Sequence, residues 1–394
     1  MSDLMQRIQQ AAKADAHLIQ QWRRHIHAHP ELSFQEVNTQ AYVIEQLKIA
    51  GITQIEPIAN TGVLAIIKGN NPDSRIIALR GDMDALPITE LNEVDYKSVN
   101  SGVMHACGHD VHTSCLLGAA KILHDLKHEW EGTIKLLFQP GEEKLPGGAS
   151  LMIADGALKN PVPQCIYGQH VMPLLPVGTV GFRSGLYMAS TDELYVKIIG
   201  KGGHGAMPHL NIDPVSIAAQ IIVALQQIVS RKANPIIPSV LSFGKVIAEG
   251  ATNVIPNEVY MEGTFRTLNE EWRTQAHQAL VNTATSIAEG MGARCEFEIR
   301  KGYPFLKNDV QLTAHAKEAA IEYLGKDKVV DLDMWMAAED FAYYSQEMPA
   351  CFYRLGTRNE AKGITSSVHT PTFDIDEDAL CIGAGLMAWI AVKH

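Results

Sequence analysis

The chain has 394 residues, of which 46% are hydrophobic and 20% are charged, a composition typical of a globular protein long enough for two domains. Its formal net charge of −11 argues against nucleic acid and anionic membranes as partners, because phosphate binding requires clustered Lys and Arg. The sequence shows no signal-peptide pattern, no apolar run of about 18 residues and no disulfide framework among its scattered cysteines, so we expect a cytoplasmic protein.

The N-terminal part of the chain is predicted to be helical. Residues 3–28 are mostly polar and give a first helical signal. Ser33 followed by Glu36 predicts a capping box, in which the two side chains bond to backbone N–H groups at the start of a helix. That helix is expected to end at Gly51.

Short runs further along the chain predict strands that are buried on both faces. Residues 76–79, 133–138 and 166–168 are short and mostly apolar, whereas residues 113–130 predict a helix. Polar side chains follow the ends of these strands or precede the helix. Because sites in open α/β sheets form outside the carboxyl ends of strands, these polar side chains are the candidate functional residues.

The pattern changes between residues 188 and 302. The order of predicted elements there is βαββαβ, which is the order of a ferredoxin-like unit. Asp213 followed by a proline predicts the start of its first helix, and Asn269 predicts the start of its second. Because such a unit buries only one face of its sheet, we expect it to be inserted into a larger domain formed by residues 1–187 and 303–394.

Two short motifs carry side chains that suit a metal site. Cys107 and His109 lie in CGH, in a turn before the predicted helix, and a helix N-terminus favours the thiolate that binds metal. Glu142 and Glu143 follow a buried strand in PGEE. Neighbouring carboxylates in a turn can point one toward a metal and one toward a substrate, although such a pair also occurs in solvated turns. Hydrolysis with a metal needs a proton acceptor of this kind.

Further histidines and carboxylates extend this candidate site. His170 in IYGQH and His369 in SVHTP bring the number of candidate ligands to five. A single catalytic zinc takes three protein ligands, so five ligands predict two metals that share a bridging residue. Asp82 and Asp84 both follow a strand, and alternate residues share a side. One of them is expected to orient a ligand histidine, unless both only cap the turn.

A glycine-rich segment at residues 200–205, GKGGHG, matches the G-x-G-x-x-G pattern of nucleotide-binding folds. Its context does not fit, because the next helix begins only near Asp213 and no acidic residue lies about 20 positions on. The glycines are better explained by a loop that presents His204.

Ten segments of the chain carry a resemblance to one family over nearly the full length. They are, in order, RRHIHAHPELSFQE, RGDMDALP, MHACGHDVHTS, FQPGEE, GQHVMP, GKGGHGAMPH, NVIPN, GTFRT, AAEDFAYY and VHTPTFDID. The chain resembles the metal-dependent amidohydrolases that include hippurate hydrolase, bacterial N-acyl-L-amino acid amidohydrolases (aminoacylases) and plant auxin-conjugate (IAA-amino acid) hydrolases. Family members usually have a glycine where AAEDF has its first alanines, a departure that affects no candidate ligand.

The resemblance implies a role for each candidate residue. Cys107, His109, Glu143, His170 and His369 would hold two divalent metal ions, with Cys107 as the bridge. Glu142 would be the general base, and Asp84 would contact a ligand side chain rather than a metal.

The resemblance also implies roles for the inserted domain. This domain would be a lid that forms a homodimer or a dimer-based tetramer. His204 of the lid would then reach the active site of the partner subunit. Asn253 and Arg266 would contact the substrate, although a structural role of Arg266 within its strand is equally consistent.

The predicted fold class is therefore α/β: a catalytic domain with a mixed sheet sandwiched by helices, plus an inserted α+β ferredoxin-like lid. The predicted reaction is hydrolysis of an N-acyl-L-amino acid, a small-molecule substrate, to a carboxylate and a free amino acid. Zinc and manganese are the expected metals, with cobalt and nickel as alternatives. Three other functions remain open: a metallo-dipeptidase or carboxypeptidase of the same fold, a non-catalytic metal-binding protein, and a nucleotide-dependent oxidoreductase.

Overall fold

The computed structural model describes residues 2–394 as two compact units. Unit 1 contains the chain up to Tyr187 together with Lys307–Met334 and Asp340–His394, and unit 2 contains Met188–Leu306 and Trp335–Glu339. The expected boundary at residue 303 thus lies at Lys307, and one short later segment is added to unit 2.

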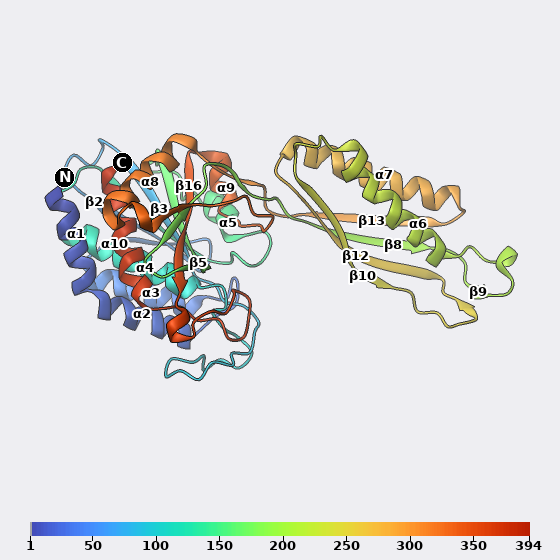
Figure 1. Ribbon diagram of the computed structural model, residues 1–394, viewed down its shortest axis with the longest axis horizontal. Helices are drawn as coiled ribbons and strands as arrows, with labels where there is room; N and C mark the ends of the chain where they lie inside the picture. Colours follow the sequence, from blue (N-terminus) through green and yellow to red (C-terminus); the bar gives the residue numbers. More distant parts are fainter. Residues whose placement is uncertain (1) are drawn as a thin grey trace. The chain divides into compact units, whose positions relative to one another are not determined.

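Unit 1 is built around an eight-stranded mixed sheet (Figure 1). The strand order is β1-β2-β4-β3-β5-β16-β6-β15, and the neighbouring pairs β4–β3, β3–β5, β5–β16 and β6–β15 are parallel. The strands are β1 (Gln54–Ile58), β2 (Gly62–Lys68), β3 (Ile76–Asp82), β4 (Thr133–Gln139), β5 (Cys165–Pro176), β6 (Val180–Phe182), β15 (Val329–Asp331) and β16 (Ala350–Arg358). Strands β7 (Gly185–Met188) and β14 (Leu306–Asn308) lie where the chain passes between the units.

Helices cover both faces of this sheet, as predicted for an α/β domain (Figure 1). Along β5 the faces alternate: Gly168 lies against Phe341, which directly precedes α9, and Gln169 lies against Gly383 in α10. The helices are α1 (Ser2–Ala14), α2 (Ala16–Ala28), α3 (Val37–Ile49), α4 (His109–Asp125), α5 (Gly148–Ala154), α8 (Val310–Leu324), α9 (Ala342–Glu347) and α10 (Asp378–Lys393).

Three parallel strands bring the candidate residues to one edge of the sheet. The predicted buried strands are confirmed as β3, β4 and β5, and every residue of β4 is buried. Asp82 at the end of β3 pairs with Gln139 at the end of β4. β5 is longer than the predicted strand, so His170 lies inside it rather than after its end. Its extra residues pair with the parallel neighbour β16.

The predicted capping box at the start of α3 is wrong. The helix begins at Val37, and in the described structure neither Ser33 nor Glu36 caps it with a side chain. The Ser33 hydroxyl donates instead to Asp84 Oδ2 at 2.6 Å, and Glu36 accepts hydrogen bonds from Gly141 and Thr61. Both side chains are thus used by segments distant in sequence.

The helix after the CGH motif begins earlier than predicted. α4 starts at His109 rather than at residue 113, so His109 occupies the first position of the helix. Gly108 precedes it with a φ of 84°, and a Cβ there would lie 2.6 Å from a methyl group of Val171. Only glycine allows both the positive φ and this close contact, which explains the glycine of the CGH motif.

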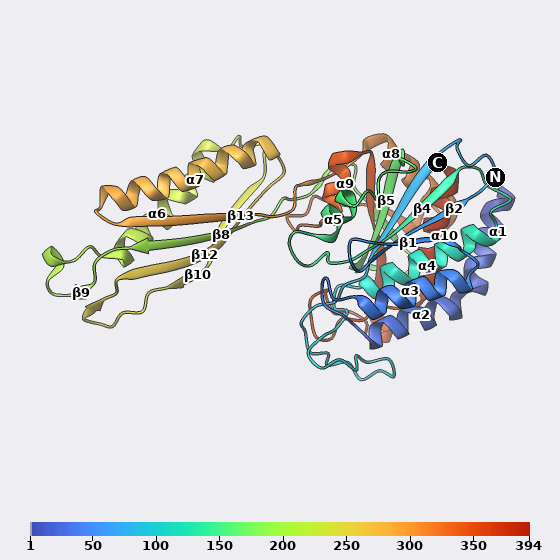
Figure 2. The ribbon, with the colours of Figure 1, turned by 180° about the vertical axis from the view of Figure 1, so that it is seen from behind.

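Unit 2 is a four-stranded antiparallel sheet with two helices on one face (Figure 2). Its strand order, β10-β12-β8-β13, together with the chain order βαββαβ, confirms the predicted ferredoxin-like arrangement. The elements are β8 (Asp192–Ile199), β9 (Gly203–His204), α6 (Pro214–Gln227), β10 (Ser239–Ile247), β11 (Val254–Ile255), β12 (Glu258–Thr267), α7 (Glu270–Gly290) and β13 (Arg294–Lys301). Its core is separate from that of unit 1.

One helical segment, Pro214–Lys232, is long and apolar enough to cross a membrane by length and composition alone. This finding differs from the expectation that the chain contains no apolar run of about 18 residues. In the structure, Ile217, Ile221, Leu225 and Ile228 are buried in the core of unit 2. Helices that cover the core of a soluble domain meet the same criterion, so this segment is weak evidence for a membrane span.

The predicted start of α7 at Asn269 is confirmed, since its side chain accepts a hydrogen bond of 2.7 Å from the backbone N–H of Trp272. We expect Asn269→Ala to lower the free energy of unfolding by about 1 kcal/mol, because one N–H group of the first helical turn loses its partner. Urea unfolding measures this change. Asn269→Gly is the matched control and should cost only about a few tenths of a kcal/mol, because glycine is itself a favourable N-cap residue. Equal losses for both variants would contradict the capping role.

Candidate metal and catalytic site

Two groups of three potential ligands share one residue at the sheet edge of unit 1. Cys107, His109 and His170 form the first group, and Cys107, Glu143 and His369 form the second. Within each group the ligand atoms all lie within 4.8 Å of one another. The five side chains predicted as ligands are therefore brought together, and Cys107 belongs to both groups.

Cys107 lies between the two outer histidines. Its Sγ is 3.5 Å from Nε2 of His170 and 3.3 Å from Nε2 of His369. The Nδ1 of His170 is held at 2.7 Å from the carbonyl oxygen of Val171, which turns Nε2 toward the sulfur. His369 has a left-handed φ of 60°, and its backbone N–H donates to Ala106 beside the cysteine. Backbone conformations of this kind are held at functional sites by their surroundings.

Asp84 connects the ligand histidine to the glutamate turn. Its Oδ1 lies 3.1 Å from Nδ1 of His109 and accepts the backbone N–H of Glu142 at 3.0 Å. Its Oδ2 accepts the N–H of Glu143 at 3.0 Å and the hydroxyl of Ser33. Burial opposes ionisation, but these hydrogen bonds and the charge of His109 hold the pKa of Asp84 below its usual value. Of the two predicted carboxylates, Asp84 is the one that hydrogen-bonds a candidate ligand.

Asp82, the other carboxylate of this pair, hydrogen-bonds a histidine that is not a candidate ligand. Its Oδ1 lies 2.5 Å from Nδ1 of His112, and its Oδ2 accepts from Arg80 at 2.7 Å. The Nε2 of His112 accepts the backbone N–H of Val171 next to His170. Asp82 and His112 thus position β5 and its histidine. A second signal in the sequence, the His112 that follows CGH by three residues, could have indicated this role.

Glu142 lies in the turn after β4 and is 7% exposed. Its Oε1 accepts the backbone N–H of Asp340 at 3.3 Å. The carboxylate of Asp340 in turn accepts hydrogen bonds from Arg80 and Gln139 at 2.8 Å each. Sequence reasoning missed Arg80 and Asp340: Arg80 lies inside an apolar strand and Asp340 lies in the turn before α9, and neither position gives a local indication of its partner.

The pKa shifts of the candidate ligands are those expected of a site that binds cations. Hydrogen bonds to Cys107 and Glu143 raise the pKa of His369 to about 10. Burial raises the pKa of the Cys107 thiol, and the Glu143 carboxylate adds to this effect. Burial opposes a proton on His109, yet the Asp82 carboxylate holds its pKa well above the usual range. A metal ion would replace these protons, as expected where thiolate, imidazole and carboxylate ligands converge.

One buried atom supports the fit to a metal directly. Nε2 of His109 is buried and has no hydrogen-bond partner among residues 2–394, and the nearest carboxylate oxygen of Asp82 is 3.6 Å away. Its Nδ1 is already engaged by Asp84. Buried polar atoms without a partner are rare in proteins, and a histidine that binds a metal holds its other nitrogen against a carboxylate in this way. The donor set therefore fits divalent metal ions.

The three other predicted residues lie in unit 2. His204 is exposed, and its strand β9 pairs with β11, where His204 faces Val254. Asn253 is exposed in the adjoining turn, and its carbonyl oxygen accepts the N–H of Gly205 at 2.8 Å. Arg266 is half-buried and donates to the carbonyl oxygen of Met336 at 3.1 Å. The contact of Arg266 supports a structural role within unit 2, and the predicted roles of His204 and Asn253 stay predictions.

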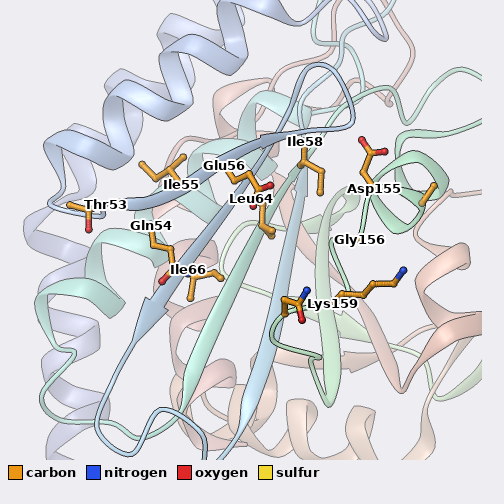
Figure 3. A pocket seen from close by; sticks show the side chains of 12 residues that line it. Thr53, Gln54, Ile55, Glu56, Ile58, Leu64, Ile66, Asp155, Gly156 and Lys159 are labelled. Carbon is orange, nitrogen blue, oxygen red and sulfur yellow. The ribbon is translucent and has the colours of Figure 1, made fainter.

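A separate pocket of about 570 Å³ lies over strands β1 and β2 and the turn after α5 (Figure 3). Leu64, Ile66, Glu56 and Lys159 form part of its lining. The twelve described residues that line it include none of the predicted ligands. It is therefore distinct from the candidate metal site.

Comparison with known proteins places the chain in a family. The sequence pattern of the peptidase family M20/M25/M40 matches residues 78–393, which include all five candidate ligands. The chain belongs to this family. It is a hydrolase of the M20 type, and the two-unit architecture is the fold of the family.

Individual relatives align over most of their length. N-acetyl-L-cysteine deacetylase of Bacillus subtilis is 42% identical over 91% of this chain and 83% of its own. An IAA-amino acid hydrolase of Arabidopsis thaliana is 39% identical over 94% of this chain and 84% of its own. The crystal structure of a dinuclear metal-binding M20 peptidase of Bacillus subtilis is 38% identical with a TM-score of 0.82, covering 96% of this chain and 98% of that one.

Proposed function

We propose that the protein hydrolyses the amide bond of N-acyl-L-amino acids, giving a carboxylate and a free amino acid. The observation that carries the proposal is the pair of ligand groups that share Cys107, with the carboxylate of Glu142 beside them. The similarity to a deacetylase and to an amino acid conjugate hydrolase supports an acylated amino acid as the substrate. The acyl group would be acetyl, benzoyl or another alkyl or aryl group.

Two divalent metal ions are proposed to bind at Cys107, His109, Glu143, His170 and His369. When bound there, they supply Lewis acidity for the hydrolytic reaction. Glu142 takes a proton from the attacking water molecule and then delivers a proton to the leaving amine nitrogen, which would otherwise leave poorly. Asp84 keeps His109 in one orientation and holds the backbone of Glu142 in place.

Metal removal tests the cofactor proposal. We expect a chelator to abolish amide hydrolysis and reloading with zinc, manganese, cobalt or nickel to restore it to different extents, because thiolate and imidazole ligands suit zinc, whereas imidazole and carboxylate ligands also accept the other three ions. Metal analysis of the reloaded enzyme should give two ions per chain. One ion per chain at full activity would contradict a dinuclear site, and unchanged activity after complete metal removal would contradict a role of metal in the reaction.

A peptidase of the same fold is the second candidate, because one solved relative is described as a dinuclear metal-binding peptidase. The two functions differ in what the substrate carries at its N-terminal side: an acyl group in one case and a free α-amine in the other. Paired assays on an N-acetyl amino acid and on the dipeptide with the same C-terminal residue separate them. A higher kcat/KM for the dipeptide would favour the peptidase.

We further propose that unit 2 forms a homodimer or a dimer-based tetramer, with His204 as a donor to the developing oxyanion. Strand β10 is at the edge of the unit 2 sheet, and Val240, Val246 and Ile247 on it are exposed. An exposed edge strand with apolar side chains favours pairing with another chain. Sedimentation of the enzyme as a monomer at assay concentration would contradict the assembly.

A further inference from the structure

Three successive backbone N–H groups of the PGEE turn each donate to a buried carboxylate. Gly141 donates to Glu36 Oε1 at 2.7 Å, and the N–H groups of Glu142 and Glu143 donate to the two oxygens of Asp84 at 3.0 Å each. Successive N–H groups that converge in a turn form a concave site for anions. Here the protein itself supplies the acceptors, which are the carboxyl groups of Glu36 and Asp84.

Glu36 is fixed in this position from both of its oxygens. The second oxygen, Oε2, accepts the hydroxyl hydrogen of Thr61 at 2.6 Å, and the residue is fully buried. The neighbouring Phe34 has a φ of 66°, and its ring lies where a Cβ on Gly141 would be, at 2.2 Å. The turn therefore rests directly on the segment that carries Glu36, and Gly141 has to be glycine for this close approach.

Glu36 and Asp84 hold the turn in different ways. Asp84 also bonds to His109, so a change at Asp84 affects a predicted metal ligand as well as the turn. The long-range hydrogen bonds that the side chain of Glu36 accepts come from Gly141 and Thr61, and neither of these is a predicted ligand. Gly141 directly precedes Glu142. A misplacement of about 1 Å at a reacting group can cost about 10²-fold in rate.

We propose that Glu36 is a positioning residue for Glu142: its hydrogen bond to Gly141 fixes the turn so that the Glu142 carboxylate faces the reacting atoms. The catalytic consequence rests on the proposed function, whereas the anchoring of the turn does not. The role requires an oxygen acceptor at position 36 rather than a negative charge. A glutamine there can still accept from Gly141 through its carbonyl oxygen and donate to the Thr61 hydroxyl oxygen through its amide.

The test compares Glu36→Ala, Glu36→Gln and Glu45→Ala in the metal-loaded enzyme. Glu45 is an exposed glutamate on α3 and serves as the matched control. Hydrogen exchange, followed by mass spectrometry of peptides that cover residues 139–144, reports the turn without any substrate. We expect faster exchange in Glu36→Ala only. In the same variant kcat should fall about 10- to 100-fold with KM within about twofold, since positioning acts on the reaction step rather than on binding.

The outcomes separate the two proposals. Unchanged exchange in Glu36→Ala would overturn the anchoring role, and faster exchange with unchanged kcat would overturn its importance for Glu142. A Glu36→Gln enzyme as impaired as Glu36→Ala would overturn the hydrogen-bond account. If the wild type cleaves no N-acyl amino acid, the proposed function fails while the exchange result still decides the anchoring. If Glu36→Ala does not fold, Thr61→Val can be used instead, because it removes the hydrogen bond from Thr61 to Oε2 of Glu36. Unchanged hydrogen exchange of residues 139–144 in Thr61→Val would then count against the proposal.

Discussion

Replacement of Glu142 by glutamine is expected to lower kcat by about 10²–10⁴-fold, the range attributed to a general acid–base group, with fold and metal content retained. Glutamine has the same size, and its carbonyl oxygen can keep the hydrogen bond from the N–H of Asp340. The amide cannot accept a proton from water or return one to the leaving nitrogen. The measurement is kcat on the preferred N-acyl amino acid, together with metal analysis and thermal unfolding of the same samples.

The matched control for this experiment is Glu93→Gln. Glu93 is exposed and belongs to the same unit, so the same chemical change there should leave kcat unaltered. Loss of metal from Glu142→Gln would make Glu142 a ligand instead of a base. Turnover within about tenfold of the wild type would remove it from the role of proton carrier, because that is less than a general base contributes.

The order of motifs predicted which side chains meet, because three of the strands beside them, β3, β4 and β5, are parallel neighbours in one mixed sheet. Asp82 ends β3, Gln139 ends β4 just before the PGEE turn, and these two residues pair in register. Parallel neighbours end at the same edge, so residues 57 positions apart become neighbours without any local signal that says so. The sheet of unit 1 and the βαββαβ unit were predictable for a different reason. Strands buried on both faces are apolar throughout, whereas half-buried strands alternate apolar and polar residues.

The supporting residues around the site could not be predicted from local patterns. Ser33 and Glu36 have the spacing of a capping box, yet their partners Asp84 and Gly141 lie 51 and 105 positions away. A capping box and a pair of long-range hydrogen bonds use the same residue types, and only the tertiary structure decides between them. In unit 2, by contrast, Asp213 and Asn269 do cap α6 and α7 as predicted, because the partners of these caps are the next residues of the chain.

The partners of the charged residue inside the sheet also could not be predicted from the sequence. Arg80 lies in a strand predicted from its apolar neighbours, and it is fully buried against Asp82 and Asp340. Removing one partner of such a buried pair leaves an uncompensated charge, which costs about 3–5 kcal/mol. The ion pair between Arg80 and Asp340 therefore holds the end of strand β3 next to the segment before α9. Asp340 also donates its backbone N–H to Glu142, so the same network reaches the turn that carries the proposed base.

Cys107→Ala is expected to weaken metal binding more than any other single substitution in the site, because Cys107 belongs to both ligand groups. Loss of a residue that only orients a ligand costs about 10- to 100-fold in metal affinity, so loss of a shared ligand should exceed about 100-fold. Metal content after dialysis should fall below two ions per chain, and hydrolysis should fall with it. Cys381→Ala, a cysteine in α10 outside both groups, is the control and should keep both ions. Because the thiolate is also the oxidisable group, peroxide should inactivate metal-free wild type faster than the metal-loaded enzyme. A Cys107→Ala enzyme that keeps two tightly bound ions would show that the thiolate is not a bridge.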